Sequence, residues 1–222
     1  MPSATMGAMP PFAMLAADPT ARLDALALAL SAELRPVDAD GALARLDELA
    51  AEVREVAGAT GGELAALRFV LGERHGFAGA EAEYDHPDHS MLDLVLEHHR
   101  GLPIALSVVY VETAFRAGIA LDGVGLSGHY VVGQFAPRVA PVLLDPFNGG
   151  RPIVAPDPSE VRPWPAHETA LRMLNNLVGS YARRNDLGRA IRAAEMRLEL
   201  SVEPDLREAL AAELRSLRAR LN

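Results

Sequence analysis

The 222-residue chain contains no cysteine and no lysine, and only 5% of its residues are aromatic. Without cysteine it can form no disulfide, bind no zinc through thiolates and carry out no thiol catalysis. Its 21 basic residues are therefore all arginine, and 30 acidic residues outnumber them, for a formal net charge of −9. Because phosphate neutralisation needs a clustered positive face, this charge argues against non-specific binding to nucleic acid or to an anionic membrane.

Long apolar runs are also absent. The Ala/Leu-rich segment that follows residue 18 is interrupted by Asp24 and Glu33, and it is far shorter than the about 20 apolar residues that span a bilayer. The stretch from Met1 to Asp18 has no basic residue ahead of an apolar run, so no signal peptide is predicted. We expect a cytoplasmic protein in which residues 1–17 are flexible.

Apolar residues at helical spacing predict a largely helical first half. Asp18-Pro19 opens a helix that Pro36 ends, and a second helix runs from about residue 38 to 56. A third follows near residues 64–71. Ser90 or Asp88 is expected to cap a fourth helix that stops near residue 101. The next helix, from Pro103 to Gly118, is apolar almost all round, which predicts a buried central helix.

The pattern then changes to short β-branched runs punctuated by glycine and proline, which is typical of strands. The expected strands are 121–126, 130–135, 141–144 and 151–154. Residues 156–166 form a proline-rich linker, with Trp164 expected to anchor the following helices to the core. Three helical runs come last, at about 167–184, 186–200 and 204–221.

The first two of these runs form a hairpin whose apolar positions approach the spacing of a tetratricopeptide unit. The residues concerned are Leu174, Leu177, Tyr181, Ala190 and Ala194, with Pro204 closing the unit. Only one unit is visible, and Ala194 stands where the repeat has a large aromatic residue, so a plain helical hairpin remains the alternative. The arginines of this region, such as Arg183, Arg184 and Arg197, alternate with acids, which predicts a solvated mixed-charge face.

Three strings in order carry a family resemblance: Arg100-Gly-Leu-Pro-Ile104, Gly128-His-Tyr130 and Leu144-Asp-Pro-Phe-Asn-Gly-Gly150. Together they resemble the transglutaminase-like superfamily over about residues 60–200, and more narrowly its Sir-B-type branch, in which such a domain precedes tetratricopeptide repeats. The resemblance implies a cysteine at the start of the central helix, a histidine that activates it and an aspartate that orients the imidazole. His129 matches the histidine and Asp145 the aspartate.

The nucleophile position departs from this pattern. Counting back from Gly118 places the superfamily's cysteine on Pro103, which has no nucleophile. Ser107 lies one turn later on the same helix face, so a Ser107–His129–Asp145 triad is one hypothesis. A serine in an apolar helix more often bonds the carbonyl four residues back. His129 and Asp145 lie 16 residues apart, which suits adjacent antiparallel strands with both side chains on one face.

A histidine-rich stretch offers a second candidate site. His86 and His89 stand beside Asp85 and Asp88, and two more histidines follow at 98 and 99. Histidines and carboxylates bind zinc, but no spacing here is a known metal-binding string, so we interpret them as surface histidines and expect no metal and no cofactor.

These observations predict a mostly helical α+β fold, in which a small antiparallel sheet packs on a buried central helix in a papain- or transglutaminase-like core. The expected parts are residues 1–17, helices in 18–58, the core in 59–155, the linker 156–166 and the helical tail 167–222. We expect a non-catalytic protein that binds a peptide, an amide-containing ligand or a partner protein. The remnant catalytic constellation is His129, Asp145 and Ser107, and the expected binding residues are Gly101, Pro103, Tyr130, Phe147 and Asn148. The alternative is a hydrolase or acyl transferase that uses His129 and Asp145 with Ser107 or an activated water.

Overall fold

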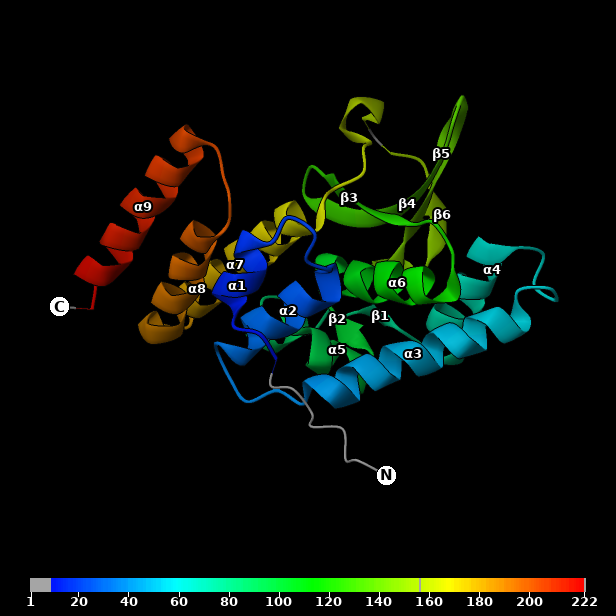
Figure 1. Cartoon of the computed structure of the whole chain (residues 1–222), viewed down its shortest axis with the longest axis horizontal. Helices are drawn as coiled ribbons and strands as arrows, with labels where there is room; N and C mark the ends of the chain where they lie inside the picture. The colour runs from blue at the N-terminus through cyan, green and yellow to red at the C-terminus, as the bar shows by residue number, and fades with distance from the viewer. Residues whose placement is uncertain (1–8, 156, 222) are drawn as a thin grey trace.

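The computed structural model describes residues 9–155 and 157–221, and it confirms a mostly helical α+β fold. The sheet lies over the central helix α6, and the tail helices extend to one side (Figure 1). The helices are α1 (Phe12–Ala17), α2 (Leu23–Ala32), α3 (Ala39–Val56), α4 (Glu63–Leu67), α5 (Leu92–His98), α6 (Pro103–Ala117), α7 (Ala166–Arg183), α8 (Leu187–Glu199) and α9 (Pro204–Ala219). The strands are β1 (Ala78–Gly79), β2 (Arg100–Gly101), β3 (Asp122–Leu126), β4 (His129–Ala136), β5 (Val139–Asp145) and β6 (Arg151–Ile153).

Helix α6 is the buried central helix that its composition predicts. It begins at Pro103, whose fixed φ suits a first helical position, and it ends before Gly118, which adopts a positive φ of 80°. Its residues are buried on nearly every side, among them Ile104, Leu106 and Val109. It packs against α3, α5 and β4, so it holds the helical half and the sheet together.

The four strands β3, β4, β5 and β6 form one antiparallel sheet in chain order, which confirms the predicted strands. Because side chains alternate along a strand, one face packs toward α6 and the other does not. Tyr130, Val132 and Leu144 join the main core. Val131 and Leu143 belong to a second, smaller core on the opposite face. The sheet is therefore buried on both faces near its centre.

The N-terminal region differs from the expected flexible segment. Residues 12–17 form helix α1, whose Phe12 and Ala16 lie one turn apart on a single buried face. This helix contacts α2 and α8, and His167 Nε2 lies 3.3 Å from the carbonyl oxygen of Leu15. Residues 12–17 of the segment expected to be flexible are thus helical, and residues 1–8 of it lie outside the described residues. A six-residue helix with one buried aromatic gives too weak a periodic pattern to detect from sequence.

Two further local features differ from the sequence analysis. Strands β1 and β2 pair in parallel beside α6, and two-residue strands carry no periodicity that a sequence could display. Neither Ser90 nor Asp88 caps α5: its N-cap position is Met91, which makes no side-chain capping bond. Ser90 is instead buried, inside the short 3₁₀ helix η2 (Pro87–Ser90), where the chain turns under α6.

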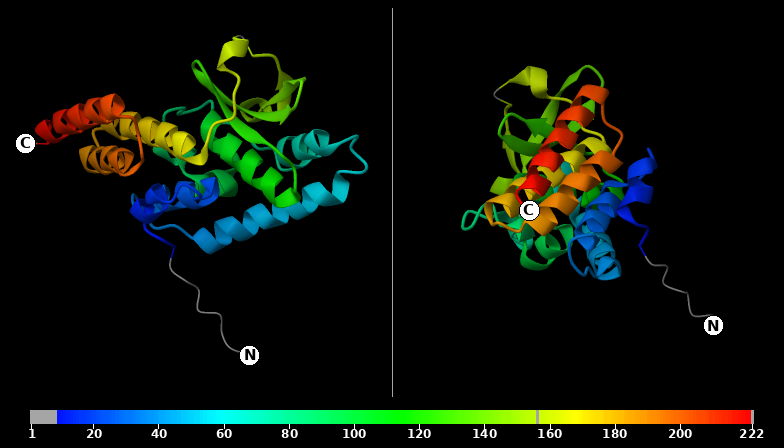
Figure 2. Two further views of the ribbon diagram at one scale, coloured as in Figure 1. Left: turned by 45° about the horizontal axis from the view of Figure 1, so that its top comes forward. Right: turned by 90° about the vertical axis from the view of Figure 1, so that its left-hand side faces the viewer.

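The tail is a helical hairpin, α7 and α8, followed by α9, and it packs back on α2 and on the turn η2 (Figures 1 and 2). Trp164 anchors its start, as expected: its backbone N–H donates to the Gly123 carbonyl at 2.9 Å, and its ring meets Tyr130 edge-on. Arg183 and Arg184 pair with Asp85 of the core. Arg197 was expected on a solvated face but is buried, where it contacts Asn175 and Glu213.

Within residues 9–155 and 157–221, no helix combines the length and the apolar character that crossing a bilayer requires.

Candidate functional site

His129 and Asp145 meet at the end of the sheet. The register pairs Val132 of β4 with Leu144 of β5, so Asp145 lies opposite Val131, and His129 is two residues away on that same face. His129 Nε2 lies 3.1 Å from Asp145 Oδ1. The predicted proximity of His129 and Asp145 is thereby confirmed. It arises because the two residues lie on adjacent antiparallel strands, as their 16-residue spacing predicted.

A local turn fixes Asp145. Its side chain accepts hydrogen bonds from the Phe147 backbone N–H at 3.0 Å and from Asn148 Nδ2 at 2.7 Å, while its carbonyl oxygen accepts from Gly150 N at 2.8 Å. Gly149 and Gly150 both adopt positive φ, of 68° and 74°, as predicted for this turn. The turn thus holds the carboxylate through two hydrogen bonds and the backbone of Asp145 through a third.

These contacts set the ionisation of Asp145. Burial raises the pKa of its carboxyl group, but hydrogen bonds from His129 and Asn148, the charge of His129 and the Phe147 amide outweigh burial, so the pKa lies below its ordinary value of 3.8. Asp145 is therefore ionised at neutral pH. An ionised carboxylate at Nε2 fixes the ring orientation of His129.

The lowered pKa of Asp145 predicts an acid-dependent loss of stability. A group whose folded pKa is depressed stabilises the fold above its unfolded pKa, and this contribution disappears as the pH falls from about 3.8 through the lower folded value. We expect the stability difference between the protein and Asp145→Asn to shrink across that window in urea unfolding experiments. A difference that stays constant from neutral pH to below pH 3 or so would contradict this assignment.

Aromatic side chains surround the histidine. The Phe147 ring lies edge-on to His129 at 6.3 Å and to Tyr84 at 6.0 Å between ring centres. A Cβ atom at Gly79 would come within 2.3 Å of Phe147, so β1 leaves room for that ring. The His129 side chain is 30% exposed and that of Tyr84 is largely exposed. The surface beside His129 is therefore aromatic, and Tyr84 belongs to it although no sequence pattern marked it.

The other predicted binding residues lie in different surroundings. Tyr130 points to the opposite face of the sheet, where it is buried and its hydroxyl lies 2.7 Å from Thr169 Oγ1. Gly101 is buried in β2, since a Cβ there would clash with Val95. Pro103 is buried in the first turn of α6. Phe147 and Asn148 are the predicted binding residues that contact His129 or Asp145 directly.

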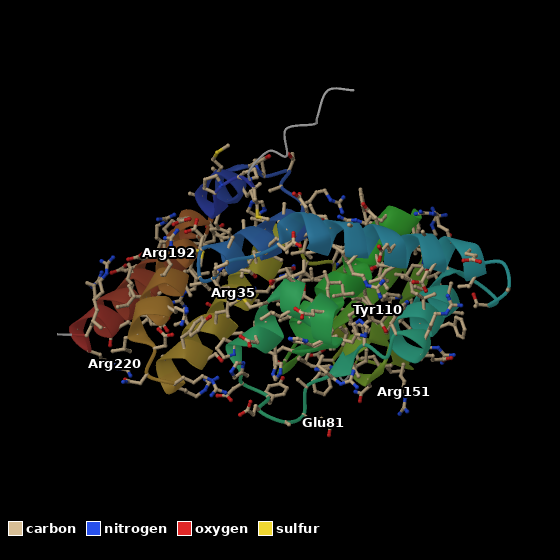
Figure 3. The ribbon with its side chains drawn as sticks, turned by 90° about the horizontal axis from the view of Figure 1, so that it is seen from below. Arg35, Glu81, Tyr110, Arg151, Arg192 and Arg220 are labelled. Carbon is tan, nitrogen blue, oxygen red and sulfur yellow. The ribbon has the colours of Figure 1, made fainter. Side chains whose placement is uncertain are left out.

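Ser107 does not complete a triad. Its side chain is fully buried in α6, and Oγ makes no hydrogen bond to any residue that the structure describes. Neither His129 nor the carbonyl four residues back accepts a hydrogen bond from this hydroxyl. The structure therefore shows neither the hypothesised triad nor the expected bond to the helix backbone. Tyr110, one turn further along the same face and labelled in Figure 3, is fully buried and lies against Gly150. Burial and the nearby Asp145 raise the pKa of the Tyr110 hydroxyl, which stays neutral.

The histidine-rich stretch does not converge on one point. His86 Nδ1 lies 3.5 Å from Asp88 Oδ2, and the rings of His86 and His89 are 5.9 Å apart. His99 ends α5 with a positive φ of 57° and packs on Phe77 instead. Nowhere in the described part of the chain do three histidine or carboxylate side chains gather as a metal ion would require.

Comparison of the sequence with known proteins identifies bacterial relatives. The chain is 38% identical over 157 residues to a UPF0162 protein of Xylella fastidiosa, a match covering 62% of this chain and 56% of that protein. A UPF0162 protein of Pseudomonas aeruginosa is 33% identical over 153 residues, covering 66% and 54% respectively. The matches thus span just over half the length of these relatives. No solved structure was found to match.

The sequence profile of the transglutaminase-like superfamily matches residues 40–192, which include α6, His129 and Asp145. The match covers more than half of the chain and includes the His129–Asp145 pair, in a protein without cysteine. This chain belongs to the transglutaminase-like superfamily.

Proposed function

We propose that this protein is a non-catalytic binding module, in which the surface around His129 and Asp145 holds a peptide or another amide-containing ligand. One observation carries the proposal: the His129–Asp145 pair is intact at 3.1 Å, whereas the chain has no thiol and the matching position is Pro103. A pair that remains oriented without its nucleophile supports a role in binding rather than in acyl transfer.

The chemistry of the site suits an amide. Asp145 engages Nε2 of His129, which leaves Nδ1 to exchange a hydrogen bond with a ligand. Phe147 and the exposed Tyr84 add apolar ring surface for a neighbouring side chain. A polar anchor beside an aromatic surface is the composition by which peptide-binding sites obtain both orientation and affinity.

The tail supports a second part of the proposal, contact with a partner protein. The α7–α8 hairpin resembles one tetratricopeptide unit, and the order of core and tail is that of the Sir-B-type branch. In α9, Leu210, Leu214 and Leu217 pack inward while Leu206 is exposed on its first turns. We propose that the tail helices present the partner surface and that the protein acts in the cytoplasm.

The alternative function is hydrolysis through an activated water. The His129–Asp145 pair has the composition of a general base with its orienting carboxylate. Ser107 is a poor nucleophile candidate because it is buried and makes no hydrogen bond to His129. The dyad alone would have to activate the water.

Activity assays separate these functions. We expect no detectable amide hydrolysis or transamidation with peptide-amide substrates, and we expect His129→Ala to weaken binding of an acetylated peptide amide measured by calorimetry. Turnover that disappears in both His129→Ala and Asp145→Asn would establish the hydrolase instead. Ser107→Ala is the matched control, since a buried serine outside the dyad should change neither measurement.

Restoring a thiol tests whether the ancestral geometry persists. In Pro103→Cys, the helix N-terminus and His129 should lower the pKa of the thiol below its ordinary value of about 8.5. The readout is the pH midpoint of iodoacetamide labelling, because burial at this position slows the absolute rate. Met14→Cys, on the exposed side of α1, provides an unperturbed thiol.

His129→Ala in the Pro103→Cys background should return the labelling midpoint toward that of Met14→Cys. Since losing proline's φ restraint can loosen the helix start, circular dichroism must show an unchanged fold. An unshifted midpoint in a folded Pro103→Cys would show that His129 and the start of α6 no longer form one site.

A further inference from the structure

A cavity lies at the edge of the sheet, and no residue of α6 lines it. It has a volume of about 310 Å³ and is bounded by the end of β3, the β3–β4 turn, the segment before α7 and α7 itself. The residues lining it are Gly125, Leu126, Ser127, Arg162, Trp164 and Arg172. Two arginines and the indole of Trp164 thus face one space on a protein whose net charge is −9.

Arg172 is the unusual group in this cavity. It is half-buried, yet it makes no hydrogen bond or ion pair with any residue in the described part of the chain. Arg138, Arg151, Arg215 and Arg220 also make no ion pair there, but they are exposed, so water solvates them. A guanidinium that is partly withdrawn from water and has no protein partner is a site for an external anion.

Among the side chains that the structure describes, none compensates the charge of Arg172. Glu168 lies four residues earlier on α7, but Arg162 engages both of its oxygens, Oε2 at 2.9 Å and Oε1 at 2.5 Å. Arg162 also stacks over Trp164, with 5.2 Å from its guanidinium carbon to the ring centre. The charges of Arg162 and Glu168 therefore cancel, so among the described residues that line the cavity Arg172 carries the unpaired positive charge.

The edge of β3 supplies a backbone donor. The Trp164 N–H bonds the Gly123 carbonyl on the outer side of β3, and Gly125, two residues on, directs its backbone groups to that same side. No bond to Gly125 from outside the sheet is found among the described residues. Trp164 lies over this glycine, since a Cβ there would come within 2.2 Å of the indole.

We infer that this cavity binds a carboxylate, held by the guanidinium of Arg172 and the backbone N–H of Gly125, with the adjoining part of the ligand against Trp164. A planar guanidinium fork matches a carboxylate, and a free backbone amide beside it adds a charge-assisted hydrogen bond. The carboxylate can be an acidic side chain or the C-terminus of a peptide. Leu126, which lines the cavity, pairs with His129 across β3 and β4. The inference nevertheless does not rest on the proposed function, because the groups that would hold the carboxylate are Arg172, Gly125 and Trp164, and none of these is a partner of the His129–Asp145 pair among the described residues.

Trp164 makes the test direct, since it is the single tryptophan of the chain and lines the cavity. Three probes are titrated against the full chain while its fluorescence is followed: acetylated trialanine with a free C-terminus, an acetylated tripeptide amide with a central aspartate, and acetylated trialanine amide. We expect saturable changes with one or both carboxylate probes and none with the neutral amide. The responding probe identifies the source of the carboxylate.

Variants complete the experiment. Arg172→Gln should weaken binding of the responding probe at least roughly tenfold, and Arg172→Lys should weaken it less because it keeps the charge without the fork. The control is Arg151→Gln, an exposed arginine of β6 at the rim of the molecule in Figure 3. His129→Ala should leave this binding unchanged. Equal binding of the neutral amide, no response to either carboxylate probe, or a loss in His129→Ala without one in Arg172→Gln would each overturn the inference.

Discussion

Replacing Arg116 by alanine is expected to lower the free energy of unfolding by roughly 3–5 kcal/mol, the cost typical of leaving buried charges without their partner. Arg116 lies near the end of α6 and joins three helices through one guanidinium. It donates to Glu112 at 2.7 Å on α6, to Asp24 on α2 and to Asp47 at 2.9 Å on α3. The side chains of Asp24 and Glu112 are almost completely buried.

The Arg116→Ala variant is expected to lose stability because the buried carboxylates of Asp24 and Glu112 then repel each other. Burial and the charge of Asp24 already raise the pKa of Glu112, against the opposing effect of Arg22 and Arg116. Without Arg116, Arg22 alone faces two buried carboxylates. Urea unfolding at neutral pH measures the effect. Glu112→Gln is the matched control: it removes one of the crowded charges instead of the cation, so its cost should be clearly smaller.

The pH dependence identifies the mechanism. A carboxyl group whose folded pKa is raised costs stability as the pH rises from its unfolded value of about 4.3–4.5 through the folded value. The deficit of Arg116→Ala relative to the protein should therefore be smaller near pH 4.5 or so than at neutral pH. A deficit that is independent of pH would instead indicate that the lost packing of the arginine stem dominates.

Replacing Asp145 by alanine is expected to cost roughly 3 kcal/mol of stability and to abolish binding at the His129 surface. The carboxylate accepts hydrogen bonds from Phe147 and Asn148 and lies 3.1 Å from His129. Its removal leaves the Asn148 amide and the imidazole without their acceptor and releases the turn that carries Phe147. Asp145→Asn retains the shape of the side chain, so its stability should lie between that of the unmodified protein and that of Asp145→Ala.

The chain contains its own control for this turn. Asp157 precedes Pro158 as Asp145 precedes Pro146, and it accepts the same backbone bond two residues on, from Ser159 N at 2.8 Å. It is exposed and makes no contact with a histidine. Asp157→Ala therefore removes the turn bond and a bond from the Ser159 hydroxyl, but no pairing with a histidine. If its effect on unfolding and on ligand binding equalled that of Asp145→Ala, the stability would come from the local turn rather than from the pair with His129.

Several features of the fold and site were determined by the sequence. The apolar run that begins at Pro103 is buried as expected up to Ala114, because a helix that is apolar almost all round has no stable place at the surface, whereas Phe115 in its last turn is exposed. The alternating strands follow their glycine and proline boundaries. His129 and Asp145 meet because their positions on adjacent strands place both side chains on the same face of the sheet. The absence of cysteine excludes thiol chemistry from the sequence alone.

Tertiary structure alone decided the rest, because burial and pairing depend on neighbours that are distant in sequence. Phe12 belongs to the core only because α1 packs against α2 and α8, and Ser107 is fully buried because the sheet closes over α6. Tyr130 adjoins His129 in sequence but faces Thr169, since neighbouring strand residues point to opposite faces. Arg172 becomes a candidate anion-binding residue only in the folded protein, where it lines a cavity with Gly125 and where Glu168 pairs with Arg162 instead.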